Sequence, residues 1–276
     1  MILTSRNKQL SLKYPQVMGI LNVTPDSFSD GGQHAQVDKA IAHAQKMLAQ
    51  GATIIDIGGE STRPGASDVL LNEELDRVIP VIEAIKKEND CWISIDTSKA
   101  EVMTEAVKAG ADIINDVRAL QEPGALQAAV QANVPVCLMH MQGQPRSMQT
   151  APNYDDVVAQ VKQFLITRSK QCIEAGIAAD NIIIDLGFGF GKSLEHNFEL
   201  LNATEAFLDL GFPVLTGVSR KSMFGQLLNR DITERLAGSL AGAMIAMQQG
   251  SKIIRVHDVA ETVDLMKVLK QVNTFK

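Results

Sequence analysis

The sequence of 276 residues is poor in cysteine and in aromatic side chains, and it has no long uninterrupted hydrophobic run. Its three cysteines, Cys91, Cys137 and Cys172, lie far apart without a CxxC or Cys/His pattern, which excludes a disulfide scaffold and favours reduced thiols. The longest apolar stretch, 236–247, is too short to cross a bilayer, and the N-terminus is too polar for a signal peptide. We therefore expect a soluble, cytoplasmic protein with no membrane partner.

Positive charge is also in deficit, because 26 Lys and Arg against 32 Asp and Glu give a net charge of −6. Such a molecule repels nucleic acids and anionic lipids, so no nucleic-acid partner is expected. An anionic ligand would need a local cluster of cations. The content of 45% hydrophobic and 21% charged residues is that of a globular protein with an aliphatic core.

Short runs rich in Ile and Val alternate along the chain with longer amphipathic stretches. Runs of this kind predict strands buried on both faces, as in a parallel sheet. The expected strands are 16–21, 53–57, 92–96, 112–116, 135–140, 181–185, 213–218 and 252–257. Several helical stretches end in glycine, at Gly51, Gly110 and Gly250, which suits a left-handed residue at a helix C-terminus.

Eight such units predict the α/β class and one closed (β/α)8 TIM barrel, rather than an open doubly wound sheet. The barrel would span 1–276 as a single domain, with long loops after its first and second strands. Polar, non-periodic residues gather just after the expected strands. Parallel strands of a barrel all end on the same face, so these clusters predict a site at one mouth.

Asp96, Asn115 and Asp185 each close a different apolar strand. Carboxylates deep in a barrel mouth are costly unless they are hydrogen-bonded or paired. Three acceptor-bearing groups suit a planar heterocycle with several N–H donors. The alternatives are that they cap the following helices, as Asp and Asn often do, or that they bind a metal, although no His joins them at ligand spacing.

Arg63, Lys221, Arg255 and His257 come from three strand ends. Arg255 and His257 alternate along one strand and therefore share a face, which points both of them into the mouth. With Lys221 close to the start of the next helix, these cations predict a pocket for phosphate or diphosphate. The alternative for each of them alone is a solvated surface charge.

Other features leave two interpretations open. His140 is either a general base or a histidine whose hydrogen bonds are satisfied at a strand end, and we favour the second. The glycine-rich segment 187–192 fits neither the Walker pattern nor GxGxxG, so it predicts only a close-approach loop. The glycines of 236–247 favour close helix packing, with a subunit contact as the alternative.

Eight motifs, in order, resemble bacterial dihydropteroate synthase. They are MGILNVTPDSFSDGG at 18–32, DIGGESTRPGA at 56–66, SIDTS at 94–98, INDV at 114–117, MHMQG at 139–143, GFGFGK at 187–192, SRKSM at 219–223 and RVHDV at 255–259. The first, second and last are highly specific. One departure is Asp185-Leu186-Gly187, where the family usually has Asp-Pro-Gly, and loss of that proline is expected to loosen the loop.

The resemblance implies a transferase of folate biosynthesis. It would join 6-hydroxymethyl-7,8-dihydropterin diphosphate to 4-aminobenzoate, giving 7,8-dihydropteroate and diphosphate, and would be a sulfonamide target. It implies the following assignments: Asp96, Asn115, Asp185, Lys221 and Arg255 for the pterin; Arg63, Arg255 and His257 for diphosphate; Thr62, Arg63, Pro64, Phe190, Ser219 and Phe28 for aminobenzoate; and Asn22 for Mg²⁺. Family members are usually homodimers, so a homodimer is expected.

The expected mechanism is dissociative alkyl transfer, in which leaving-group charge neutralisation and positioning dominate and no covalent enzyme intermediate forms. Two rival functions remain. A pterin-binding methyltransferase module would not need Arg63 or the diphosphate pocket, and an inactive pterin-binding protein would be expected to lack Asn22 or Arg63. Both residues are present.

Overall fold

The computed structural model describes residues 1–24, 33–61, 68–143, 148 and 152–274. Within them, eight parallel strands close into a barrel in the order β10-β3-β4-β5-β6-β7-β8-β9. The barrel strands are β3 (Gln16–Asn22), β4 (Ile54–Gly58), β5 (Trp92–Asp96), β6 (Ile113–Asp116), β7 (Val136–Met139), β8 (Ile182–Asp185), β9 (Val214–Thr216) and β10 (Ile253–Val256). All eight lie within the ranges expected from the sequence to within one or two residues, apart from β9, which is shorter.

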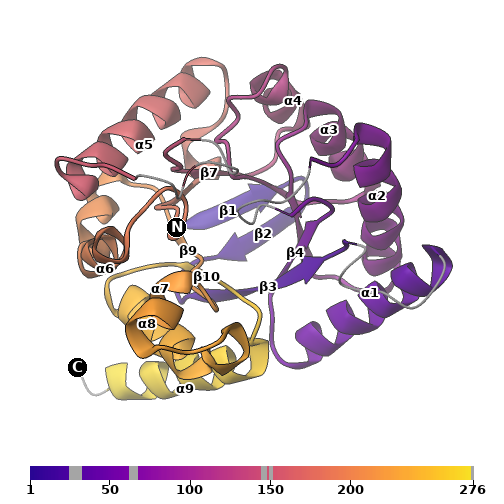
Figure 1. Ribbon diagram of the computed structural model, residues 1–276. Helices are drawn as coiled ribbons and strands as arrows, with labels where there is room; N and C mark the ends of the chain where they lie inside the picture. Colours follow the sequence, from indigo (N-terminus) through magenta and orange to yellow (C-terminus); the bar gives the residue numbers. More distant parts are fainter. Residues whose placement is uncertain (25–32, 62–67, 144–147, 149–151, 275–276) are drawn as a thin grey trace.

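Helices surround this barrel as an outer ring (Figure 1). They are α1 (Gln33–Ala49), α2 (Leu71–Glu88), α3 (Ala100–Ala109), α4 (Ala125–Ala132), α5 (Val157–Glu174), α6 (Leu194–Asn202), α7 (Ser222–Leu228), α8 (Leu236–Gln248) and α9 (Val259–Asn273), with 3-10 turns at Ala179–Asn181, Thr204–Leu210 and Ile232–Glu234. Each barrel strand is followed by at least one helix, which confirms the α/β class and the TIM barrel. The three glycines expected at helix ends, Gly51, Gly110 and Gly250, all have positive φ.

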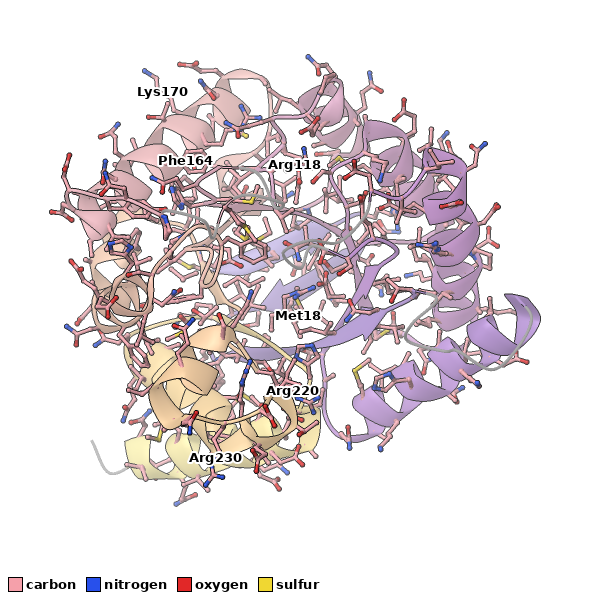
Figure 2. The ribbon with its side chains drawn as sticks, in the orientation of Figure 1. Met18, Arg118, Phe164, Lys170, Arg220 and Arg230 are labelled. Carbon is pink, nitrogen blue, oxygen red and sulfur yellow. The ribbon has the colours of Figure 1, made fainter. Side chains whose placement is uncertain are left out.

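The wall of the barrel is aliphatic on its outer face, where the strands meet the helices. Side chains such as Ile55, Ile57, Ile93 and Ile95 are fully buried there against helix residues such as Val78. The inner face carries a second apolar cluster, which includes Met18, labelled near the middle of the ring in Figure 2. Burial on both faces explains why the strands are continuous apolar runs.

A two-stranded antiparallel hairpin, β1 (Ile2–Ser5) and β2 (Lys8–Ser11), closes the amino-terminal end of the barrel and was not expected from the sequence. Leu3 and Leu12 are 1% exposed and pack against inward side chains at the start of the barrel strands, among them Trp92 and Ile253. The hairpin crosses the middle of the ring in Figure 1. We refer to it as the floor of the barrel, and to the carboxyl-terminal end of the strands as the mouth.

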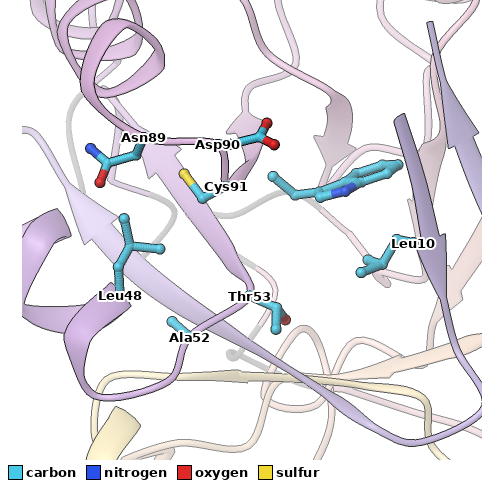
Figure 3. Close-up of a pocket in the computed structure, with 8 residues that line it drawn as sticks. Leu10, Leu48, Ala52, Thr53, Asn89, Asp90 and Cys91 are labelled. Carbon is cyan, nitrogen blue, oxygen red and sulfur yellow. The ribbon is translucent and has the colours of Figure 1, made fainter. Parts of the chain in front are cut away.

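A groove of about 410 Å³ lies beside the floor (Figure 3). It is lined by Leu10 of the hairpin, by Leu48 in the last turn of α1, by Ala52 and Thr53 just before β4, and by Asn89, Asp90, Cys91 and Trp92 at the start of β5. The groove is therefore at the end of the barrel opposite to the clustered polar residues. In the described part of the chain, no helix is long and apolar enough to span a membrane.

The glycines of α8 serve helix packing, as favoured from the sequence. A Cβ at Gly242 would lie 2.6 Å from Cζ of Phe224, and one at Gly238 would lie 3.0 Å from Cβ of Phe224. Phe224 belongs to α7, so the two glycines let α7 and α8 approach closely. Two other side chains of α8, Met244 and Ile245, are partly exposed.

Candidate active site at the barrel mouth

Alternation along the strands separates an apolar layer at the floor from a polar layer towards the mouth. Along β4, Ile54 belongs to the inner apolar cluster, and Asp56, two residues later, faces the same interior. On β10, Ile253 likewise belongs to the inner apolar cluster, and Arg255, two residues later, faces the same interior. Asn115 and Asp185 stand two residues beyond the apolar inward side chains Ile113 and Ile183 of their strands. Polar groups from five strands thus meet above the apolar layer.

Arg255 lies at the centre of this polar layer and is bound by two carboxylates. Its Nε donates to Oδ2 of Asp56 at 2.6 Å, and its Nη2 donates to Oδ2 of Asp96 at 2.7 Å. The amide of Asn115 donates to Oδ2 of Asp56 at 3.3 Å. The prediction that Arg255 points into the mouth is confirmed, and the interpretation of Arg255 as a lone surface charge is wrong.

Asp56 is the residue of this network that sequence reasoning missed. Its side chain is fully buried, and it holds both Arg255 and Asn115. It stands in the middle of an apolar strand rather than at its end, so the search for strand-end clusters passed over it. The available signal was its alternation with Ile54 and Gly58 on one face of β4.

Burial dominates the electrostatics of this layer. It raises the pKa of Asp96 to about 7, with the negative charges of Asp56, Asp116 and Glu74 acting in the same direction and Arg255 opposing them. Burial also raises the pKa of Asp185, against the N–H of Gly187 and the cations around it. For Arg255, burial disfavours the charge, but Asp56 and Asp96 outweigh it and raise the pKa above its ordinary value. The layer therefore holds a permanent cation, Arg255, together with two carboxyl groups of raised pKa, those of Asp96 and Asp185.

The helix-cap interpretation of the strand-end acids is wrong. The residues that precede α3, α4 and α6 as N-caps are Lys99, Gly124 and Ser193. Asp96, Asn115 and Asp185 instead bind within the mouth, where Asp185 accepts the backbone N–H of Gly187 at 2.7 Å.

Lys221 and His257 lie at the rim of the mouth. The Nζ of Lys221 stands 4.2 Å from the ring centroid of Phe190, and Lys221 is the N-cap residue of α7, as expected from its place in the sequence. Nδ1 of His257 lies 3.1 Å from Oγ of Ser219, which also accepts the backbone N–H of His257 at 3.2 Å. Two predicted groups, the cations and the aminobenzoate residues, therefore adjoin each other here.

His140 is buried with a hydrogen-bond partner for its ring, which agrees with the structural interpretation favoured from the sequence. It is 6% exposed, and its Nδ1 lies 3.0 Å from Nζ of Lys192. Burial and the neighbouring ammonium of Lys192 lower the pKa of His140 to about 3. Such a weak base is unsuited to general base catalysis near neutral pH.

Four of the predicted site residues, Phe28, Thr62, Arg63 and Pro64, lie outside the described residues. Asn22 is the last residue of β3 and pairs with Gly58 of β4, at the mouth. Among the residues that the structure describes, no group of three or more His, Cys, Asp or Glu side chains is arranged to hold a metal ion. A metal held entirely by such side chains is thus not found there.

Comparisons with known proteins agree with this geometry. A family model described as "Pterin binding enzyme" matches residues 18–257. The dihydropteroate synthase of Haemophilus influenzae is 58% identical over 268 residues, which cover 97% of this chain and 98% of that protein. The chain belongs to the dihydropteroate synthase family.

Solved structures of dihydropteroate synthases have the same fold. The Yersinia pestis enzyme, in a sulfonamide drug complex, has a TM-score of 0.95 at 56% identity, covering 99% of this chain and 100% of that one. The Xanthomonas albilineans enzyme with 4-aminobenzoic acid has a TM-score of 0.94 at 50% identity, covering 99% and 98%. The family resemblance drawn from the eight motifs is confirmed, and so is the assignment to transferases of folate biosynthesis. These relatives do not support the methyltransferase alternative.

Proposed function

We propose that the mouth of this barrel joins 6-hydroxymethyl-7,8-dihydropterin diphosphate to 4-aminobenzoate, with release of diphosphate, as a dihydropteroate synthase. The observation that carries the proposal is the layer in which Arg255 is held by Asp56 and Asp96 beside Asn115 and Asp185. Its hydrogen-bond acceptors lie deep in the mouth of the barrel, and cations lie towards the rim of the mouth. A pterin diphosphate has N–H donors at one end and negative charge at the other.

The pterin ring would lie against the deep acceptors. Asp96, Asn115 and Asp185 carry oxygens that suit the N–H groups of the 2-amino-4-oxo edge of the pterin. Lys221 would donate to the ring, and the guanidinium of Arg255 would lie against it while also reaching the diphosphate. Because Asp56 fixes Arg255 before any ligand binds, little side-chain entropy is lost on binding.

The diphosphate would be bound by Arg63, Arg255 and His257, with Mg²⁺ held on the protein side by Asn22. Magnesium prefers oxygen ligands and is commonly bound by one or two protein groups together with substrate phosphates. The amide oxygen of Asn22, at the end of β3, fits that pattern. Bound Mg²⁺ would neutralise charge on the departing diphosphate.

The aminobenzoate would bind at the rim, between Phe190 and Ser219 and the residues Thr62, Arg63, Pro64 and Phe28. Phe190 is 9% exposed, packs in a small apolar cluster with Met139, and has Nζ of Lys221 over its ring, so it offers an apolar wall beside a cation. Sulfonamides, which imitate aminobenzoate, would compete there. Relatives whose structures hold a sulfonamide drug or 4-aminobenzoic acid support binding of aminobenzoate and sulfonamides by this family, and the residues named here are our proposal.

The chemistry would be a dissociative alkyl transfer. The bond between the pterin methylene carbon and the diphosphate oxygen breaks with both electrons going to oxygen, which leaves a cationic methylene. The arylamine nitrogen donates its electron pair to that carbon and then releases a proton to solvent. The protein contributes positioning and charge neutralisation, so no strong general base is required.

Further features support proposals on the cellular location, the domain organisation and the oligomeric state of the protein. Cys91, Cys137 and Cys172 are free and buried, which supports a reducing, cytoplasmic location. We also propose that 1–276 form one domain built on the barrel. Exposed apolar side chains gather on α7 to α9, which lie together in Figure 1, and support a homodimer through this face; they are Leu227, Leu228, Leu236, Met244, Ile245, Val268 and Val272.

The direct test is to incubate the purified protein with the pterin diphosphate, Mg²⁺ and 4-aminobenzoate, and to measure both dihydropteroate and diphosphate. We expect the two products in equal amounts, with inhibition by a sulfonamide that is competitive with aminobenzoate. No product above background from folded protein would refute the proposed reaction. Diphosphate without dihydropteroate would refute the assignment of the aminobenzoate site.

A further inference from the structure

The segment 187–191 follows β8 and forms one side of the candidate site. It carries Phe190, and a Cβ at Gly189 would lie 3.1 Å from Cδ of Lys221, so the segment touches the stem of that lysine. The backbone has positive φ at Gly187, Gly189 and Gly191. A Cβ at Gly187 would lie 1.8 Å from the carbonyl oxygen of His140, and one at Gly191 would lie 2.3 Å from that of Gln142. The segment is therefore in direct contact with the backbone that follows β7.

The side chain that binds this segment from within is Lys192. It is 3% exposed, and its Nζ donates to the carbonyl oxygens of Gly187 at 2.8 Å and Phe190 at 3.1 Å. It also lies 3.0 Å from Nδ1 of His140. One amine thus joins the carbonyl groups of Gly187 and Phe190 to His140, the residue that follows β7.

Two further contacts fix the outer side of the segment. The hydroxyl of Tyr154 donates to the carbonyl oxygen of Gly191 at 2.8 Å, and the N–H of Gly189 donates to Oδ1 of Asn197 at 2.7 Å. Burial raises the pKa of Tyr154 to about 12, so the hydroxyl remains a donor at physiological pH. These bonds constrain a loop that the loss of the family's proline at position 186 was expected to loosen.

From this arrangement we propose that Lys192 is a positioning residue, which with Tyr154 holds the backbone of 187–191 so that Phe190 and Lys221 are correctly placed for the two substrates. The inference rests on the proposed roles of Phe190 and Lys221. Lys192 does not face the reacting atoms, because its amine is directed at backbone carbonyls and at His140. Its loss should therefore disturb substrate binding more than the chemical step.

Lys192→Met tests the proposal, because methionine keeps the length of the side chain and removes the donor. We expect KM for 4-aminobenzoate to rise about tenfold, KM for the pterin diphosphate to rise about threefold, and kcat to stay within about twofold. Lys162→Met is the matched control, since Lys162 also donates to a carbonyl oxygen, that of Ala206, but on α5 outside the mouth. Its kinetic constants should equal those of the unchanged protein.

Equal KM values in Lys192→Met and the unchanged protein would overturn the proposal, and so would a fall in kcat with both KM values unchanged. If Lys192→Met does not fold, Tyr154→Phe tests the proposal instead. It removes the hydrogen bond from the Tyr154 hydroxyl to the carbonyl oxygen of Gly191 without leaving a large cavity. We expect about a threefold rise in KM for aminobenzoate, and an unchanged KM would overturn the proposal. An inactive unchanged protein would instead refute the proposed function, so the two failures are distinguishable.

Discussion

Asp56 and Arg255 form a salt bridge inside the barrel, 2.6 Å between Oδ2 and Nε, although 199 positions separate them in the chain. Asp56 is fully buried and the side chain of Arg255 is 22% exposed. A buried ion pair contributes little to stability by itself, but removing one partner leaves an uncompensated charge. The pair therefore defines the conformation of the candidate site more than it stabilises the fold.

Arg255→Ala should abolish turnover. It removes the guanidinium proposed to contact both pterin and diphosphate, and it leaves Asp56 and Asp96 without their cation. We expect kcat/KM for the pterin diphosphate to fall by about a thousandfold or more. The control is Arg230→Ala, since Arg230 is paired with Glu234 at the surface. Activity close to normal in Arg255→Ala would contradict the assignment.

Asp56→Asn should raise KM for the pterin diphosphate by about tenfold, because a neutral amide binds the guanidinium of Arg255 more weakly than a carboxylate does. It should also lower the pKa of Asp96, since the negative charge of Asp56 helps to raise it. NMR titration of the carboxyl group of Asp96 in both proteins measures the second effect. An unchanged pKa together with an unchanged KM would show that Asp56 does not act on this site.

Asp96→Asn should change the pH dependence of stability. Because the pKa of Asp96 is about 7 in the folded protein and near 4 when unfolded, the folded state binds the proton more strongly between these values. The contribution of Asp96 to stability is thus present below pH 4 and lost as pH rises through about 7. Urea unfolding should show Asp96→Asn gaining on the order of 2 kcal/mol relative to the unchanged protein between pH 4.5 and pH 8. A pH-independent difference would contradict the raised pKa.

Gly187→Ala should destabilise the protein more than Gly211→Ala. Both glycines have positive φ, 68° and 81°, so alanine carries a similar backbone cost at each. A Cβ at Gly187 would meet the carbonyl oxygen of His140, but at Gly211 it would meet nothing within 4 Å. We expect Gly211→Ala to lower the free energy of unfolding by about 1 kcal/mol and Gly187→Ala by about 3 kcal/mol or more. Equal losses of unfolding free energy in the two variants would show that segment 187–191 can shift away from His140 at little cost.

Met244→Glu should dissociate the proposed homodimer, because a carboxylate would be buried in the apolar face of α8. Ile166→Glu on α5 is the matched control, since Met244 and Ile166 are each 40% exposed. Analytical ultracentrifugation should show at least about a hundredfold weaker dimerisation of Met244→Glu, and no change for the control. A monomeric unchanged protein, or an intact Met244→Glu dimer, would refute this interface.

Much of the barrel was predictable, because strands buried on both faces must be apolar runs and helices between them must be amphipathic. The floor was not, since β1 and β2 are four-residue segments in which polar side chains are common, and the buried side chains in and beside them are Leu3, Ser5 and Leu12. Their burial depends on a barrel formed by distant residues. No local pattern distinguishes such a hairpin from an exposed tail.

Within the site, position at or near a strand end predicted that Asp96, Asn115, Asp185 and Arg255 lie in the mouth. Asp56 could have been found by following alternation inside the strand. Lys192 could not, because its partners are backbone carbonyls, and their direction depends on the positive φ values of Gly187, Gly189 and Gly191. A lysine beside glycines is, from sequence alone, equally compatible with a solvated or a ligand-binding amine.

The floor hairpin also couples the two ends of the chain during synthesis. Leu3 packs in one cluster with Ile253, and β10 completes the barrel by pairing with both β3 and β9. Because Leu3 is synthesised about 250 residues before Ile253, the hairpin cannot reach its final surroundings until β10 has been added. Before then Leu3 and Leu12 lack part of the apolar surface they pack against, so truncations before β10 should leave the hairpin open to proteolysis.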